Sequence, residues 1–446
     1  MKKSPADLLS LLGDARLSSE ELQTLAFETG FFRRAGGKIP AADMLIHLCL
    51  ESMEGTVSYN DLAARIEAQT GISASRQAYW EKTTEACLQF FQRVLERLLR
   101  APGRGAAAQA MIESGRFTRI VVQDSTVIQL PRRLFQVFSG VRNAHTTVCN
   151  ARIQGTYNLL SGRFLAFSID AYSKNDLAVT RDLEVEPGDL VLRDRGYFTV
   201  AAIAAQKAVG ADSINRYKHQ TTFFDPVTGE ALNLLALLTQ QGSVDRIVLA
   251  GTAQKMPIRL VAVRVNDETA NVRRMKAKRN LSRHAPSADL LQLMSWSIFL
   301  TTLTAPDITF KDLLALYGLR WRIENIFKTW KSHFSFAKVH TVSERQLRIL
   351  LTARLIMITL CYQQLYLSLA RPIHDATGKH LSLMKLMRYL RQNLGLVREL
   401  LDLQTAEAGR LEAIGRYCTY EKRTRAHFMT SMEQTLAASN PAGGLA

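Results

Sequence analysis

The sequence predicts an α/β protein, with a core of strands and helices that is interrupted by a β-rich insertion and flanked by helical regions. Three observations predict this class. Residues 1–110 and 346–446 carry apolar residues mainly at three- and four-residue steps, as amphipathic helices do. From residue 119 the pattern changes to alternating or continuous apolar runs, which are typical of strands with a shielded face. Strands then alternate with helices, which is the order of an α/β sheet.

The bulk composition favours a folded protein with a polyanionic partner. The chain has 446 residues, enough for two to four domains, and its 47% hydrophobic and 22% charged content excludes wholesale disorder. The formal charge is +17 and the sequence pI about 9.8. Nucleic acid is therefore the first candidate partner and an anionic membrane the second. A basic protein with a solvated surface is the alternative.

Cysteine usage and hydropathy predict a cytoplasmic protein that does not enter a membrane. The five cysteines are scattered without a CxxC spacing, which indicates neither a disulfide framework nor a zinc site. The N-terminus lacks the apolar run of a signal peptide. The apolar stretch 350–370 is interrupted by Arg354, Gln363 and Gln364, so we expect a buried helix there and no membrane partner.

The N-terminal region, residues 1–110, includes a candidate helix-turn-helix over residues 58–84. A first helix leads to a turn at Gly71, a cap at Ser73, and a second helix that presents Arg76 and Gln77. A second helix of this kind can enter a DNA major groove, which makes Arg76 and Gln77 candidate DNA contacts. Simple packing of a helical hairpin is an equally good interpretation.

The core is predicted from the order of its elements. Strands are expected at 119–130, 151–160 and 163–172, followed by a helical stretch at 176–184, a buried strand within 189–198, a helix at 201–210 and a strand at 211–217. Three strands followed by alternating helix and strand is the order of a ribonuclease H-like core. We assign this core to residues 115–215 and 291–345, the second part beginning with a buried strand at 295–303.

The insertion covers residues 216–290 and is expected to be largely β. It ends in the basic run 273–283, which is either a solvated loop or a track for phosphates. The candidate DNA contacts in this run are Arg273, Arg274, Lys276 and Lys278.

Residues 317–331, YGLRWRIENIFKTWK, are expected to form one helix with a charged face. Tyr317, Arg320, Glu324 and Lys331 fall within about 60° of one another on a 3.6-residue helix. An apolar stripe on another face would pack this helix on a sheet. A solvated charged face is the alternative interpretation.

Two further acids lie in or at the end of apolar strands. Asp124 is central in 119–130, and Asp194 ends the strand LVLRD. A carboxylate in a buried strand is costly unless it is paired or metal-bound. Oxygen ligands without His or Cys favour Mg²⁺ or Mn²⁺ over zinc. Together with Glu324 they could hold two ions that activate water or a DNA 3′-hydroxyl.

These motifs resemble a known family. DST at Asp124, DRGY at Asp194 and the spacing Tyr317-x₂-Arg320-x₃-Glu324-x₆-Lys331 are similar to the DDE acids and the Y-R-E-K signature of IS4-family insertion-sequence transposases, over residues 115–345. The resemblance implies that Asp124, Asp194 and Glu324 are the catalytic, metal-binding acids.

The resemblance also implies roles for the remaining site residues and for partners. Tyr317, Arg320 and Lys331 would hold DNA phosphates, and Trp296 would stack on a flipped base of a hairpin end; a core tryptophan is the alternative for Trp296. The partners would be double-stranded DNA, as terminal inverted repeats and target, and a second copy in a homodimer on paired ends, near the nucleoid in a bacterial cytoplasm. A catalytically inactive regulator and a nuclease or resolvase without strand transfer remain the rivals.

Overall fold

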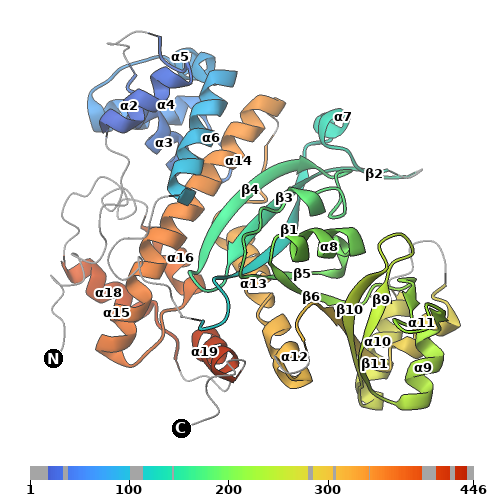
Figure 1. Cartoon of the computed structure of the whole chain (residues 1–446). Coiled ribbons are helices and arrows are strands. Elements are labelled where there is room, and N and C mark those ends of the chain that lie inside the picture. The colour runs from blue at the N-terminus through green and yellow to red at the C-terminus, as the bar shows by residue number, and fades with distance from the viewer. Residues whose placement is uncertain are drawn as a thin grey trace. The chain divides into compact units, whose positions relative to one another are not determined.

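The computed structural model describes residues 19–33, 39–100, 114–142, 145–279, 285–304, 308–340, 342–393, 408–421 and 427–438 (Figure 1). The sequence APGRGAAAQA at 101–110 predicts a linker, and it lies outside these residues. Contacts group the chain into two compact units. The first unit comprises residues 1–113, 125–173 and 322–427, and the second comprises residues 114–124, 174–321 and 428–446.

In the first unit, the N-terminal helices pack on one another, and two of them also contact a buried helix from the C-terminal region. They are α2 (Ser19–Glu28), α3 (Ala41–Glu54), α4 (Tyr59–Thr70), α5 (Arg76–Lys82) and α6 (Glu85–Arg100). Both α3 and α6 contact α14 (Glu344–Thr359), which Figure 1 shows running beside α6. Arg354 of α14 is fully buried and donates to the carbonyls of Ser52 and Gly55 at the end of α3. Its guanidinium thereby satisfies carbonyls that a helix end leaves without partners.

The helical hairpin expected at 58–84 is present as α4 and α5. The Ser58 side chain accepts from the backbone N–H of Asp61 to cap α4, and Gly71, at φ +72°, ends that helix. The cap of α5 is Ser75, not the expected Ser73, since the Ser75 hydroxyl accepts from the N–H of Ala78 at 3.2 Å.

The strands of the first unit form an antiparallel ribbon that carries helix α13 (Trp321–His333). The strands are β2 (Gly140–Arg142), β3 (Thr147–Asn158) and β4 (Arg163–Ala171). Gly155 of β3 lets the helix approach closely: a Cβ there would lie 3.0 Å from Cζ of Phe327. Phe327 of α13 then stacks with Phe164 of β4, and Trp330 packs against the same ring at an interplanar angle of 47°.

The C-terminal helices complete the first unit. After α14 the helix continues as a π-helix at Leu360–Tyr366 and as α15 (Leu367–Thr377), followed by α16 (Leu383–Gln392) and α18 (Ala408–Tyr417). The run Glu344–Thr377 is long and apolar enough to cross a membrane, but 94% of its most apolar window is buried in the protein. The expected buried helix is therefore confirmed.

The second unit is built on a mixed sheet. Its strand order is β1-β5-β6-β11-β10-β9-β7-β8. The β1–β5 and β5–β6 pairs are parallel and the others antiparallel. The strands are β1 (Arg119–Leu130, which passes into the first unit after Asp124), β5 (Asp189–Arg193), β6 (Asp212–Arg216), β7 (Phe223–Phe224), β8 (Ala231–Leu232), β9 (Val244–Ala250), β10 (Met256–Arg264) and β11 (Trp296–Thr301). Helix α8 (Val200–Ala208) connects β5 to β6, as the α/β order predicts.

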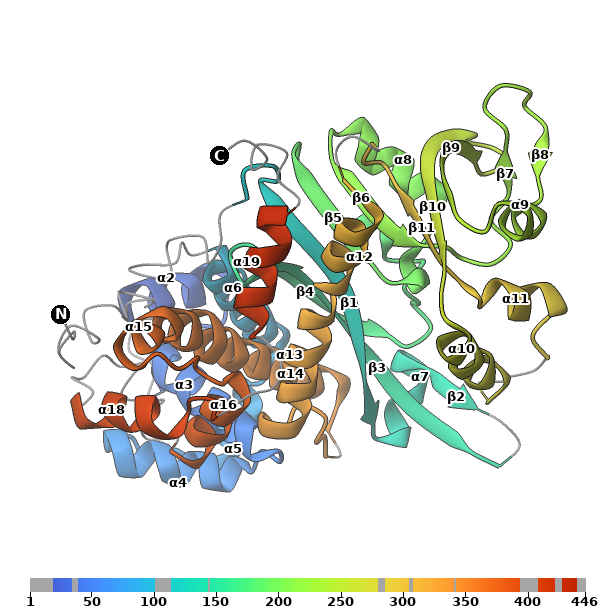
Figure 2. The same cartoon turned by 90° about the horizontal axis from the view of Figure 1, so that it is seen from below.

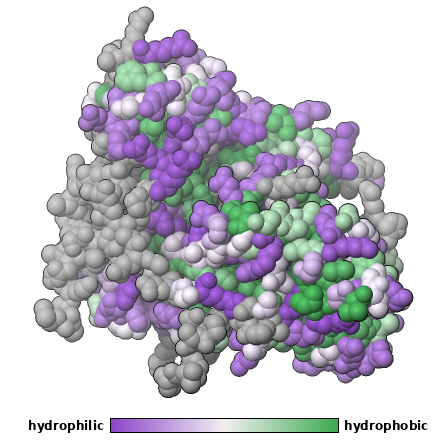
Figure 3. Space-filling view, in the orientation of Figure 1, coloured by the Kyte–Doolittle hydropathy of each residue, from purple (hydrophilic) through white to green (hydrophobic). Residues whose placement is uncertain are grey.

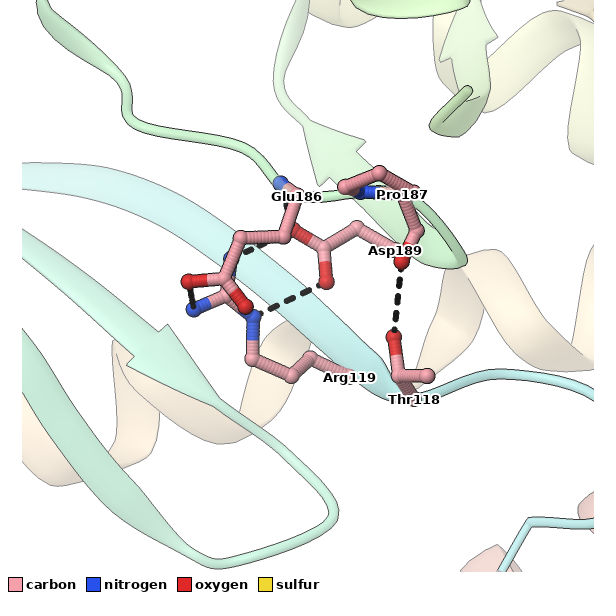
Figure 4. A network of polar contacts seen from close by, with 5 residues as sticks. All are labelled: Thr118, Arg119, Glu186, Pro187 and Asp189. Atoms are coloured by element: carbon pink, nitrogen blue, oxygen red, sulfur yellow. Dashed lines mark hydrogen bonds and ion pairs between the residues drawn. The ribbon is translucent and has the colours of Figure 1, made fainter. Parts of the chain in front are cut away.

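An ion-pair network ties the starts of β1 and β5 together (Figure 4). Arg119 donates from Nε and Nη2 to the two carboxylate oxygens of buried Asp189, at 2.8 and 2.6 Å, and from Nη1 to Glu186 at 2.8 Å. A bidentate pair of this kind fixes orientation as well as distance. It therefore helps to set the parallel register in which Gln123 faces Arg193.

The segment expected as an insertion contains helices as well as strands. Figure 2 shows α9 (Leu234–Gln241), α10 (Asp267–Arg279) and α11 (Ala288–Leu293) beside β9, β10 and β11. The loop interpretation of the basic run is wrong for Arg273 to Arg279, which lie in α10; good helix formers such as Met, Lys, Arg and Ala dominate there. Residues 280–283 lie outside the described residues.

The helical stretch expected at 176–184 is wrong. This segment forms turns and one short 3₁₀ helix, Thr180–Asp182. Buried Arg193 donates to the carbonyl of Thr180 at 3.1 Å, and the Thr180 hydroxyl donates to the carbonyl of Asp176. These tertiary and local bonds take up carbonyl groups that an α-helix would use.

The single helix expected over 317–331 is also wrong. Helix α12 (Phe310–Gly318) ends before α13 begins at Trp321, and the N–H groups of Leu319 and Arg320 bond three residues back, to Leu316 and Tyr317. Gly318 at the junction has low helix propensity. Tyr317 and Arg320 thus belong to the second unit, whereas Glu324 and Lys331 belong to the first.

Candidate active site

Asp124 and Asp194 lie on neighbouring parallel strands of the second unit. The last paired residues of β1 and β5 are Gln123 and Arg193, and each aspartate follows directly. Parallel strands are about 4.8 Å apart, so the two acids occupy adjacent strand positions. The side chain of Asp124 is 14% exposed, and Asp194 is exposed at the start of the 3₁₀ turn Arg195–Tyr197. The C-terminal end of a parallel strand is a common location for sites in α/β sheets.

Two residues of α12 and its C-terminal turn hold this pair of strands. Nη1 of Arg320 lies 3.0 Å from a carboxylate oxygen of Asp124, and Arg320 is itself buried. The Tyr317 hydroxyl donates to the carbonyl of Arg193, the residue before Asp194, at 3.2 Å. Burial raises the pKa of Tyr317 to about 12, so its hydroxyl stays protonated and remains a donor.

Glu324 and Lys331 lie on α13, in the first unit. Glu324 is half-buried in the first turn of that helix. Lys331 donates from Nζ to the carbonyl of Val127 on β1 at 2.8 Å, and burial lowers its pKa. In the structure Lys331 therefore anchors α13 to β1.

The donor set suits a hard divalent ion. Among the described residues, no group of three His, Cys, Asp or Glu side chains lies close enough to hold a metal. Asp124 and Asp194 are nevertheless two carboxylates on adjacent strands of the second unit, whereas Glu324, the third predicted ligand, belongs to the first unit. Oxygen ligands without nitrogen or sulfur suit Mg²⁺ or Mn²⁺.

A basic, aromatic pocket of about 260 Å³ lies in the second unit. Trp296 contributes a ring to its wall, and the indole N–H donates to the carbonyl of Gly242 at 2.7 Å, which fixes the ring. Its other lining residues are Arg195, Arg216, Tyr217, Arg273, Lys276, Ala277, Leu290, Leu293, Met294 and Ile298.

The arginines of this pocket repel one another. Burial and the charge of Arg195 lower the pKa of Arg216, and burial, Arg216 and Arg195 lower the pKa of Arg273. Asp194 acts on Arg216 in the opposite direction. A bound anion would relieve the repulsion, and the apolar and aromatic wall would suit a planar ring. The pocket can therefore accept a group that is both anionic and aromatic.

The four basic residues proposed from the run at 273 have different environments. Arg273 donates to the carbonyl of Trp296 and the hydroxyl of Ser297, both at 3.0 Å. Arg274 donates to the carbonyl of Leu291 at 3.1 Å and the hydroxyl of Ser295 at 2.6 Å. These two arginines fasten α10 to neighbouring segments, whereas Lys276 and Lys278 are exposed.

The short helix α5 presents polar side chains to solvent. Arg76 and Gln77 are exposed, Trp80 is 49% exposed, and Tyr79 on the opposite side is buried. On the face shown in Figure 3, hydrophilic side chains cover most of the N-terminal helices. This exposure meets the first requirement of a helix that reads DNA.

Sequence reasoning missed three residues near these features. Arg216 is the last residue of β6 and Arg195 lies two residues after the end of β5, and basic residues at the ends of parallel strands were the available signal. Trp321 is 58% exposed, and the guanidinium carbon of Arg320 lies 5.9 Å from its ring centre. Its position outside the apolar stripe of α13 was the signal there.

Comparisons with known proteins identify the family of the chain. The model of the family described as "Transposase DDE domain" matches residues 115–360, more than half of the chain. The chain is 26% identical over 444 residues to the transposase for insertion sequence element IS231F of Bacillus thuringiensis subsp. israelensis, with 92% of each chain covered. It is 23% identical over 364 residues to the transposase for IS1151 of Clostridium perfringens, with 76% of each covered.

Among solved structures, the chain is similar to the piggyBac transposase in a synaptic complex with hairpin DNA. The TM-score is 0.42 and the identity 9%, over 95% of this chain and 87% of the other. On the extent of the family match, the chain belongs to the Transposase DDE domain family and is a transposase.

Proposed function

We propose that this transposase cleaves DNA at the ends of an insertion sequence with the help of divalent metal ions, and joins the freed ends to target DNA. The adjacent positions of Asp124 and Asp194 on β1 and β5 carry the proposal. A water attacks the phosphorus at the element end and the 3′-oxygen leaves as a hydroxyl; that hydroxyl then attacks a target phosphodiester, and another 3′-oxygen leaves. Bound Mg²⁺ or Mn²⁺, as two ions, would supply charge stabilisation and a more acidic attacking oxygen.

The protein's own residues would hold the reactants in place. We propose Asp124, Asp194 and Glu324 as the metal-binding acids. Arg320 balances the charge of Asp124 at 3.0 Å in the structure, and beside DNA its guanidinium would bind a phosphate. Tyr317 supports the strand end before Asp194, and Lys331 is proposed to exchange its carbonyl partner for a phosphate.

The basic pocket is proposed to receive an extruded nucleotide during hairpin formation. Trp296 would stack on the base, which is worth about 1–3 kcal/mol. Arg195, Arg216 and Lys276 would neutralise the phosphates, consistent with the mutual repulsion of the pocket's arginines. Arg273 would act mainly by holding α10 in place, and Arg274 likewise.

The remaining parts of the proposal concern recognition and assembly. Helix α5, through Arg76 and Gln77, would read the terminal inverted repeat, and two copies would pair the two ends. The chain would be an IS4-like enzyme with a ribonuclease H-like core, interrupted by the segment that contains β7 to β10. The expected four-domain division, the second copy and the location at the nucleoid of a bacterial cytoplasm remain proposals.

The first test is Glu324→Gln. It removes one negative charge and one ligand oxygen but keeps the side-chain volume, so we expect nicking to be lost by at least about a thousandfold while end binding persists. Gel-shift and single-turnover nicking assays measure the two properties. Asn325→Ala, an exposed neighbour on α13, is the matched control. Nicking by the Gln variant at the wild-type rate in Mg²⁺ would remove Glu324 from the site.

A strand-transfer assay separates the proposal from its two rivals. A pre-cut element end with a free 3′-hydroxyl is supplied together with a plasmid. Joined product supports the transposase reaction. Nicking without joining would indicate a nuclease or resolvase, and end binding without nicking would indicate a regulator.

A further inference from the structure

A buried arginine lies two residues before Glu324 on α13. Arg322 is 9% exposed, and its side chain forms hydrogen bonds with the hydroxyls of Tyr157, Tyr362 and Tyr366. These three tyrosines are called the tyrosine cage. The guanidinium carbon also lies 5.9 Å from the ring centre of Tyr366. All four residues belong to the first unit.

The tyrosines of the cage also contact one another. The hydroxyls of Tyr157 and Tyr362 lie 2.6 Å apart, and the rings of Tyr362 and Tyr366 stack with centres 5.5 Å apart. Burial raises the pKa of all three tyrosines, so their hydroxyls stay neutral and can accept from Arg322. The guanidinium therefore has a fixed set of directional partners.

A π-helix supplies two of the three tyrosines. Tyr362 and Tyr366 both lie in the π-helical stretch Leu360–Tyr366, which is pinned to β4 because the backbone N–H of Phe164 donates to the Gln363 side chain at 2.7 Å. A π-helix is less stable than an α-helix and is found disproportionately at functional sites. Here it brings two hydroxyls to one arginine.

The directions of Arg322 and Glu324 are coupled by helix geometry. Residues two apart on an α-helix point about 160° away from each other. With Arg322 buried, Glu324 is turned out of the core of the first unit and is half-buried. The apolar side chains of α13 resist its removal from the sheet, but they define its rotation less sharply than hydrogen bonds do.

We infer that Arg322 and the tyrosine cage are positioning residues, which set the rotation of α13 and so the direction of the Glu324 carboxylate toward its metal ion. The inference rests on the proposed function, since it gives Glu324 the role of a metal ligand. It extends the site to four residues outside the Y-R-E-K spacing.

Arg322→Met tests the inference, because Met fills much of the space without the hydrogen bonds. We expect the variant to fold and bind ends, while the Mg²⁺ or Mn²⁺ concentration for half-maximal nicking rises roughly 10–100-fold, the usual effect of losing a group that orients a metal ligand. Arg322→Lys should restore part of the loss. Arg354→Met is the matched control: it removes another buried guanidinium of the same unit, so it should lower Tm without changing the metal requirement.

A second measurement does not depend on nicking. Fe²⁺ with ascorbate and peroxide, added to the complex with an end, should cut the wild-type backbone near Asp124, Asp194 and Glu324. In Arg322→Met the cut near Glu324 should weaken relative to the other two. Tyr362→Phe, which removes a single oxygen, should change both readouts in the same direction, and it serves if the Met variant does not fold.

The outcomes separate the inference from the proposed function. Wild-type protein that shows neither metal-dependent nicking nor iron cuts at the three acids would overturn both. The inference alone is overturned if the wild-type protein nicks and is cut by iron as expected, and Arg322→Met or Tyr362→Phe has the same metal requirement and the same iron cuts as the wild type. An equal rise in metal requirement in Arg354→Met would also overturn it, because general destabilisation would then explain the effect.

Discussion

Asp124 is stabilised in the structure by a paired arginine rather than by an ion. Its carboxylate is 14% exposed, and the guanidinium of Arg320 at 3.0 Å supplies the charge that a buried carboxylate requires. If Asp124 takes up the proposed ion, the same arginine would become available for the phosphate that the acids would otherwise repel. The pairing observed here and the DNA contact proposed for Arg320 are therefore compatible roles of one residue.

Two variants of Trp296 distinguish a packing role of this residue from a role in stacking on a base. Trp296→Ala should leave first-strand nicking nearly normal and lower hairpin formation by about 1–3 kcal/mol of stacking energy, whereas Trp296→Phe, which keeps a ring, should lose less. Both variants lose the bond to the Gly242 carbonyl, so the Phe variant controls for it. Time-resolved gels of the two steps make the measurement. Equal loss of both steps, with a matching fall in Tm, would assign the residue to packing.

Residue types were easier to predict than residue partners. Asp124 and Asp194 could be selected because an acid in an apolar strand is unusual and costly. Arg273 and Arg274 were grouped with Lys276 and Lys278 because all four are basic and adjacent in sequence. The two arginines differ from the two lysines because they donate to carbonyls and hydroxyls of segments distant in sequence that pack on α10. No local sequence pattern predicts these contacts.

At the scale of elements, the strands were predicted well where hydropathy alone defines them. The bounds expected for β1 are those observed, and β4 ends one residue early. The two failures have different causes, one a tertiary contact and the other the local backbone. Arg193 donates a hydrogen bond to the carbonyl of Thr180, which an α-helix would use. The expected helix over 317–331 is divided after Gly318, where two backbone N–H groups bond to carbonyls three residues back. That division places two members of the Y-R-E-K spacing in each unit.

The packing of α13 on its ribbon predicts the cost of a side chain at Gly155. A Cβ there would lie 3.0 Å from Cζ and 3.3 Å from Cε1 of Phe327, so Gly155→Val should destabilise the protein by about 1–3 kcal/mol. Phe327→Leu in the same chain should recover part of this loss by making room. Urea unfolding followed by circular dichroism measures both variants.

Gly415→Ala is the matched control for that experiment. Gly415 lies in α18 of the same unit with nothing within 4 Å of the added methyl group. It should stabilise the helix by up to about 1 kcal/mol, because alanine has the higher helix propensity. A Gly155→Val variant as stable as the wild type would show that α13 does not sit against β3 at this point.

At the scale of the whole molecule, charge and DNA binding are linked. The chain carries a formal charge of +17, and each phosphate neutralised by a Lys or Arg adds about 0.9 to the slope of log affinity against log salt on duplex DNA. Binding to any duplex should therefore weaken steeply between 50 and 200 mM salt. Preference for the element end must come from a smaller set of contacts to base edges.

Two neighbouring residues of α5 allow the sequence-independent and the sequence-specific contributions to DNA binding to be measured separately. Arg76 and Gln77 are both exposed there. If Arg76 holds a phosphate, Arg76→Ala should weaken binding to all duplexes alike and reduce the salt slope by about 1. If Gln77 reads a base, Gln77→Ala should leave the slope unchanged and cost about 1–3 kcal/mol on the end sequence alone.

Arg93→Ala, which replaces an exposed arginine on α6, is the control and should change neither quantity. Fluorescence anisotropy on end and scrambled duplexes at several salt concentrations measures both. If neither α5 variant differs from the Arg93 control, α4 and α5 are a packed hairpin, and end recognition lies elsewhere in the chain.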